Sequence, residues 1–263
     1  MPLVFSCVVP HPPVIIPSVG RNNLKDVQKT VLAMESLSKK FVQTRPETVL
    51  VISPHTPLLP RFFCIKAVSK MSGGFQNFGA PEENFEFLGD LDFANQIVSA
   101  AKKEKLPVLL SRDSDLDHGV LVPLYFFSQN WTKFRLVVLS LSMLDLQTHF
   151  HLGKFLQRVI QKQAKKIAIV ASGDLSHRLT PDAPAGYNPR GKKFDELLIK
   201  LLKKKETQRI LELDPKLIED AGECGFRSII ILLGILENLD YNVKILSYEG
   251  PFGVGYLVLE FTF

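Results

Sequence analysis

The sequence feature that most constrains the fold is the run Thr48-Val49-Leu50-Val51-Ile52-Ser53-Pro54-His55. Its four consecutive apolar residues favour a strand with both faces buried, which is typical of a parallel sheet covered by helices. Pro54 ends such a strand because it has no N–H for the sheet and restricts the residue before it. His55 then lies beyond the carboxyl end of the strand, the edge at which open α/β sheets bind ligands.

Similar strand patterns alternate with helical patterns along all 263 residues. We expect strands at about 3–9, 48–52, 62–67, 107–110, 135–141, 166–171, 243–248 and 256–261, and helices at about 22–41, 93–105, 146–162, 193–204, 206–211, 215–221 and 225–238. This alternation, without a repeat or a linker, predicts a single α/β domain with a central mostly parallel or mixed sheet flanked by helices. Residues 69–89 are rich in Gly and Phe without clear periodicity, and we expect a long loop with a short strand there, placed to act as a substrate lid.

Composition excludes several classes of protein. The chain is 46% hydrophobic and 22% charged, as expected of a globular protein with a substantial core. Its net charge of +5 resides mostly in lysine clusters near predicted helix ends, without interleaved aromatic residues, so no nucleic-acid partner is expected.

The sequence predicts no membrane span, no signal peptide and no disulfide framework. The longest apolar run, 229–236, is too short to cross a bilayer, and the N-terminal residues lack the pattern of a signal peptide. Cys7, Cys64 and Cys224 are an odd number without CxxC spacing, which argues against a disulfide framework. We therefore expect a cytoplasmic protein without a membrane partner.

Four of the six histidines lie just beyond predicted strands: His11, His55, His118 and His177. Any one of them alone is most simply a hydrogen-bonded loop residue, but parallel strands would bring all four to one edge of the sheet. Neutral imidazole binds Fe, Zn, Cu and Ni, and two histidines with one carboxylate suit non-haem Fe(II) oxygen chemistry. His149 and His151 begin a predicted helix instead, and we expect surface or capping roles for them.

The carboxylate of such a site has two candidates. Glu223 lies in Ala221-Gly222-Glu223-Cys224-Gly225, just before an apolar helix, where a glutamate more often interacts with the helix dipole than with a metal. Glu249 is the weaker candidate. Spacing alone leaves the choice open.

At these residues the chain resembles the LigB-like family of class III extradiol dioxygenase catalytic subunits, which includes the Memo-like proteins. The matching motifs are His11-Pro-Pro, Ser53-Pro-His55, Asp117-His118-Gly119, Ser172-Gly-Asp-Leu-Ser-His177 and Ala221-Gly-Glu-Cys-Gly225, in the family's order. Each motif is weak alone, but the ordered set is specific. The resemblance implies a LigB-like extradiol dioxygenase domain over 1-263, with its active site at the carboxyl ends of the strands.

The resemblance further implies one Fe(II) held by His11, His55 and Glu223. It implies that His177 is the acid/base, that His118 contacts substrate or oxygen, and that Pro12 and Asp174 lie beside the substrate. The implied partners are dioxygen and a catecholic or aminophenolic compound.

Cys224 is the main departure from the dioxygenase pattern, because Memo-like relatives carry a cysteine in this segment. A His₂Cys site would be softer and better suited to copper or zinc. The sequence therefore leaves three hypotheses: a ring-cleaving dioxygenase, a Memo-like non-catalytic module that binds metal or a partner protein, and a zinc hydrolase. The apolar terminal strands are compatible with a homodimer.

Overall fold

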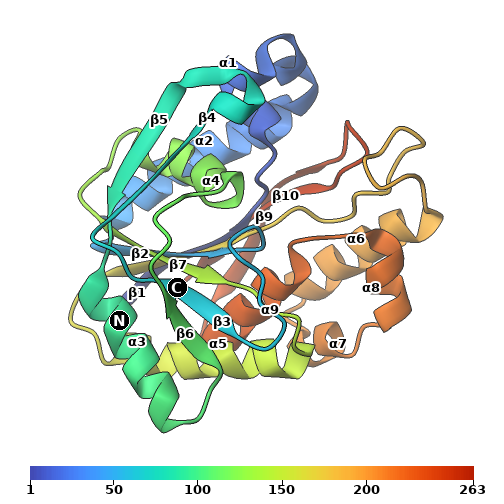
Figure 1. Cartoon of the computed structure of the whole chain (residues 1–263). Coiled ribbons are helices and arrows are strands. Elements are labelled where there is room, and N and C mark those ends of the chain that lie inside the picture. The colour runs from blue at the N-terminus through green and yellow to red at the C-terminus, as the bar shows by residue number, and fades with distance from the viewer.

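Four parallel strands form the centre of the fold, which the computed structural model describes for residues 1–263 (Figure 1). They belong to an eight-stranded sheet of order β6-β3-β7-β2-β8-β1-β10-β9. The central strands are β7 (Arg135–Ser140), β2 (Thr48–Ser53), β8 (Ile167–Ser172) and β1 (Leu3–Val9).

The outer strands make the sheet mixed. On one side β3 (Phe63–Lys66) is antiparallel to β7, and β6 (Val108–Ser111) is parallel to β3. On the other side β10 (Tyr256–Thr262) is antiparallel to β1, and β9 (Asn242–Glu249) is antiparallel to β10. The prediction of an α/β fold with a mostly parallel, mixed sheet is confirmed.

The register aligns the carboxyl ends of the central strands. Val9 pairs with Ser172 across β1 and β8, and Ile52 pairs with Ala171 across β2 and β8. Because these strands end level with one another, the residues that follow them leave the sheet at one edge.

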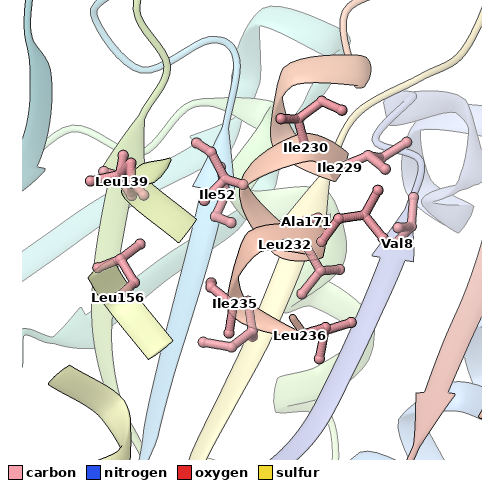
Figure 2. Close-up of a cluster of buried hydrophobic side chains, with 14 of the residues drawn as sticks. Val8, Ile52, Leu139, Leu156, Ala171, Ile229, Ile230, Leu232, Ile235 and Leu236 are labelled. Atoms are coloured by element: carbon pink, nitrogen blue, oxygen red, sulfur yellow. The ribbon is translucent and has the colours of Figure 1, made fainter. Parts of the chain in front are cut away.

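Two helical layers cover the sheet, because alternate side chains of each central strand face opposite sides. One side packs α3 (Leu91–Lys103), α5 (Leu146–Gln161), α6 (Pro189–Lys203) and α9 (Phe226–Ile235), with the short α7 (Thr207–Leu211) and α8 (Pro215–Ala221) beyond them. Figure 2 shows this layer, in which Ile229 and Leu232 of α9 lie against Val8 and Ala171 of the sheet. The other side packs α2 (Gln28–Thr44) and α4 (His118–Ser128).

Most expected elements are confirmed, with the start of the first long helix as an exception. Residues 22–27 belong to a 3₁₀ segment, Arg21–Val27, which follows a 3₁₀ turn at Pro13–Ile15 and α1 (Pro17–Gly20). Helix α2 begins only at Gln28 and has no side-chain cap, so the expected start of a helix at about residue 22 was wrong.

The segment expected to be a long loop is a β-hairpin. It comprises β4 (Lys70–Phe75), a 3₁₀ turn at Gln76–Phe78 and β5 (Ala80–Leu88), paired antiparallel in a sheet of their own. The hairpin stands beside α4 in Figure 1, and its buried residues Met71, Phe75 and Phe87 join the core on that side. The alternation of polar and aromatic residues in Asn84-Phe85-Glu86-Phe87 is the strand signal that the glycines of β4 masked.

None of the helices combines the length and the hydrophobicity that a membrane-spanning segment requires.

Candidate metal centre

Three imidazole rings converge beyond the carboxyl ends of the central strands. The Nε2 atoms of His11 and His55 lie 3.0 Å apart. The ring of His118, the first residue of α4, lies 4.2 Å from that of His55 and 5.4 Å from that of His11, between centroids. One ring nitrogen from each of the three lies within 4.8 Å of the others, close enough to share a metal ion.

The tautomer of His11 follows from its hydrogen-bond partner. Its Nδ1 atom lies 2.9 Å from the Ser172 hydroxyl, which itself donates to the carbonyl of Gly119 at 2.5 Å. Since that hydroxyl has only one proton to give, its oxygen accepts from His11 Nδ1–H. The Nε2 atom of His11 therefore presents a lone pair toward His55, as a metal-binding imidazole requires.

Cys224 is the sulfur donor nearest to His11. Its Sγ atom lies 3.5 Å from His11 Nε2 and accepts the N–H of Asp174 at 3.2 Å. This position depends on a close backbone approach, because a Cβ added at Gly173 would lie 2.1 Å from the Cα of Gly225. Only glycine at both places lets the Cys224 turn reach the end of β8.

Glu223, the carboxylate expected beside the histidines, is directed elsewhere. Its Oε2 atom accepts the N–H of Phe226 at 2.5 Å, at the start of α9. Burial raises the pKa of this carboxyl to about 7. The other candidate, Glu249, accepts the N–H and hydroxyl of Thr30 at 2.7 and 2.6 Å. Neither belongs to a group of donors around His11.

The carboxylate that does lie near His11 is that of Asp174. Its Oδ1 atom accepts the backbone N–H of His11 at 2.9 Å, and its Oδ2 atom lies 4.0 Å from His11 Nε2. Its burial raises the pKa to about 7. His11, Asp174 and Cys224 thus form a second group of donors within 4.8 Å of one another. Pro12, which we expected beside the substrate, is buried, and its carbonyl accepts the N–H of Ile15.

The imidazoles of the cluster favour the neutral form. Burial, together with the neighbouring histidines, moves the pKa of His11 well below its usual value. Burial also lowers the pKa of His55, and burial and His55 lower that of His118 to about 4. Neutral imidazoles keep the lone pairs that a metal needs. Burial raises the pKa of the Cys224 thiol, so a thiolate there would require a positive charge such as a metal ion.

Asp117 holds His118 against the end of β2. Its carboxylate accepts the hydroxyls of Ser53 and Thr56 at 2.9 Å each and caps α4 through the N–H of Val120. A Cβ at the next residue, Gly119, would lie 2.5 Å from the Ser53 hydroxyl. These contacts explain why aspartate and glycine flank His118 in this motif.

His177 follows β8 and lies near enough to the cluster to contribute to the lowered pKa of His11. Its Nδ1 atom lies 3.0 Å from the carbonyl of Leu175. A carbonyl only accepts, so Nδ1 carries the proton of the neutral ring and Nε2 carries its lone pair. A second carbonyl, that of Gly222, also interacts with this ring. Burial lowers the pKa of His177, which keeps it neutral near pH 7.

A cavity of about 570 Å³ opens on the outer side of His118. The β4–β5 hairpin supplies one wall and the residues before α4 supply the other. Phe78 at the tip of the hairpin meets His118 edge to face, with ring centroids 5.4 Å apart. The hairpin is therefore a regular strand pair that forms one wall of the cavity, and its action as a substrate lid stays a prediction.

His149 is buried, which corrects the expectation of a surface or capping residue. Its Nδ1 atom lies 2.8 Å from the carbonyl of Asp145, and its ring packs against Phe63. Burial lowers its pKa to about 4. His151 is exposed, as expected. No role was expected for Ser172 or Ser53, although both lie in the motifs, because a serine at a strand end has no distinctive sequence pattern.

A comparison with protein families matches residues 6–259 to the family described as the catalytic LigB subunit of aromatic ring-opening dioxygenase. The chain belongs to the LigB family. Its relatives in this family include proteins named as dioxygenases and proteins named as MEMO1 family members.

A protein of Clostridium acetobutylicum is 33% identical over 96% of this chain and 56% of its own length. A MEMO1 family protein of Methanococcus maripaludis is 26% identical over 63% of this chain and 57% of its own length. The chain thus spans about half the length of these curated relatives. The 3,4-dihydroxyphenylacetate 2,3-dioxygenase of Escherichia coli is 25% identical over 81% of this chain and 82% of its own length.

Among solved structures, an uncharacterized protein of Escherichia coli K12, JW3007, matches with a TM-score of 0.70 and 18% identity. The match covers 98% of this chain and 99% of that one. This likeness supports the LigB-type fold over the whole chain.

Proposed function

We propose that this chain is a metal-dependent dioxygenase of the extradiol, ring-opening type, acting on a catecholic or aminophenolic substrate. One observation carries the proposal: His118 and His177 lie around the His11–His55 pair, next to a cavity of about 570 Å³. A site that only stored a metal would need neither further imidazoles nor an adjoining cavity.

The donors of this chain fit a single transition-metal ion. His11 belongs to two groups of donors, one with His55 and His118 and one with Asp174 and Cys224, and it would hold the ion together with His55. Cys224, rather than Glu223, is the further donor in contact with His11. Asp174 offers a carboxylate oxygen beside His11 and Cys224, so a carboxylate of the kind that Fe(II) sites use lies next to one of the two histidines. A bound Fe(II) ion would supply Lewis acidity toward a phenolic oxygen and redox chemistry toward dioxygen.

The chain's own residues would then handle the proton of the substrate. His177 is neutral, and with Nδ1–H held by Leu175 its Nε2 atom would accept the proton of an aromatic hydroxyl. A positioned base of this kind contributes on the order of 10²–10⁴-fold to the rate. His118, fixed by its place at the start of α4, would hydrogen-bond the bound substrate from the cavity side.

A second candidate function is a Memo-like metal-binding or protein-interaction module that opens no ring. The contact between Cys224 and His11 favours it, because a thiolate makes the donor set softer and more suitable for copper or zinc than the dioxygenase set.

Anaerobic reconstitution with Fe(II), followed by catechol and aminophenol panels in air, separates the two. The dioxygenase is expected to form yellow ring-opened products and to consume dioxygen. If the protein retains iron yet leaves a wide panel unchanged, the second candidate replaces the first, and parallel titrations with Cu(I) and Zn(II) then define the metal.

A further inference from the structure

The cavity beside His118 has an unusual charge for a basic protein. Two acidic residues line it, Asp115 and Asp117, and no lysine or arginine does. The chain as a whole carries a formal charge of +5. The lining is therefore anionic where the rest of the chain is, on balance, cationic.

The two carboxylates differ in how they are engaged. Asp117 accepts hydrogen bonds from Ser53 and Thr56 and belongs to the framework around His118. Asp115 donates its backbone N–H to Asp113, but its carboxylate forms no ion pair. Asp115 is exposed at the cavity wall, so its charge is available to a ligand.

Two cations near the cavity, Lys66 and Arg21, are bound to other groups. Lys66 is buried, and its ammonium donates to the carboxylate of Asp113 and the carbonyl of Asp115. Arg21 donates to the carbonyl of Gly79 at the tip of the hairpin and does not line the cavity. Neither offers an anchor for an anionic substituent.

The apolar part of the lining favours an aromatic ligand between these groups. Phe78 and Phe85 of the hairpin line the cavity together with His118. A ring placed against them would have one end at His118, on the side of the metal-binding cluster, and would extend along the wall that carries Asp115.

We propose that the substrate of this site is an aromatic compound whose ring carries a cationic amine, which lies against Asp115, rather than a carboxylate. The proposal rests on the function proposed above, because it takes the cavity to be the substrate side of the metal centre. Beyond that function, it specifies that the ring substituent that takes no part in ring opening carries a positive charge.

Three catechols that differ only at the substituent test it: dopamine with an ammonium group, 4-methylcatechol without charge, and 3,4-dihydroxyphenylacetate with a carboxylate. Their Kd values are measured by calorimetry on the Fe(II)-loaded protein without oxygen. An exposed charge pair is worth about 0.2–1 kcal/mol, so dopamine should bind up to about fivefold more tightly than 4-methylcatechol, and the carboxylate more weakly than both.

Asp115→Asn should remove this order while leaving the Kd of 4-methylcatechol unchanged. The matched control is Asp240→Asn, which removes one exposed carboxylate in the connection between α9 and β9. Equal affinities for the three probes, a preference that persists in Asp115→Asn, or no binding at millimolar concentration would each overturn the proposal.

Turnover in air is recorded separately, so that the two proposals fail independently. The ammonium preference without ring opening would leave the inference standing and remove the dioxygenase. Ring opening of all three probes with equal Kd values would support the dioxygenase and refute the preference for a cationic substituent.

Discussion

The Sγ atom of Cys224 lies 3.5 Å from the Nε2 atom of His11, close enough for one metal ion to bind both atoms. Cys224→Ala is therefore expected to lower metal affinity by at least tenfold, because it removes the sulfur donor and leaves Asp174 as the one non-histidine donor beside His11. Glu223→Ala should leave the metal stoichiometry unchanged and lower the free energy of unfolding by about 1 kcal/mol, since it removes the acceptor for the N–H of Phe226.

Equilibrium dialysis with metal analysis, and urea unfolding of both metal-free variants, provide the measurements. If Glu223→Ala empties the site and Cys224→Ala does not, the carboxylate is the ligand and the side chain of Glu223 turns when the metal binds.

The strands and helices could be predicted because each has a local cause. Thr48–Ser53 is a strand buried on both faces, and Asp214 caps the helix that Pro215 begins, both as expected from their residue types. The β4–β5 hairpin was missed because its apolar residues face α4 rather than the main sheet, and its two glycines weaken the strand pattern. His149 was misplaced since nothing local indicates that Phe63 will cover it.

At the site, sequence reasoning could identify the four histidines but could not choose between Glu223 and Cys224. These are adjacent residues in a turn, and one peptide unit decides which side chain faces His11. The deciding contact, between Gly173 and Gly225, joins residues distant in the chain. No local sequence pattern predicts such a contact.

The Ser172 hydroxyl offers a test of how the imidazole of His11 is held. Ser172→Ala should weaken metal binding by about 10–100-fold, because Nδ1 of His11 loses the acceptor that fixes its tautomer and ring orientation. Metal titration of the variant measures the effect.

Ser6→Ala is the matched control for this experiment. Ser6 is also fully buried in a central strand, but its hydroxyl has no hydrogen-bond partner. Equal affinities in the two variants would show that the hydroxyl of Ser172 has no part in metal binding.

His177 is expected to act on the substrate and not on the metal. In His177→Ala, metal content should be unchanged while kcat falls by roughly 10²–10⁴-fold, because the Nε2 base is removed. Metal analysis and oxygen consumption on the same sample separate these effects.

The exposed His151 supplies the control, since His151→Ala removes an imidazole outside the cluster. Metal loss in His177→Ala would assign this histidine to the ligands and refute its role as a base.

The buried carboxyl of Asp195 on α6 is expected to make the free energy of unfolding depend on pH. This carboxyl is fully buried, accepting the N–H of Ser176 at 2.9 Å and the hydroxyl of Tyr248 at 2.6 Å. Burial raises its pKa to about 7, which the two hydrogen bonds only partly offset. Between the ordinary pKa of 3.8 and about 7, the folded protein therefore keeps a proton that the unfolded chain has released. The contribution of Asp195 is thus fully present at low pH and is lost as pH rises through this window.

In Asp195→Asn this loss should disappear, because the amide has no proton to release. The difference in unfolding free energy between the protein and the variant should change by up to ~1.4 kcal/mol per pH unit inside the window and be constant below it. Urea unfolding of the metal-free proteins from about pH 4 to pH 8 measures it, with the exposed Asp182→Asn as control. Parallel curves of unfolding free energy against pH for the protein and Asp195→Asn would contradict this prediction. They would mean that the Asp195 carboxyl is ionised over the whole range, because the hydrogen bonds from Ser176 and Tyr248 stabilise its charge more than burial destabilises it.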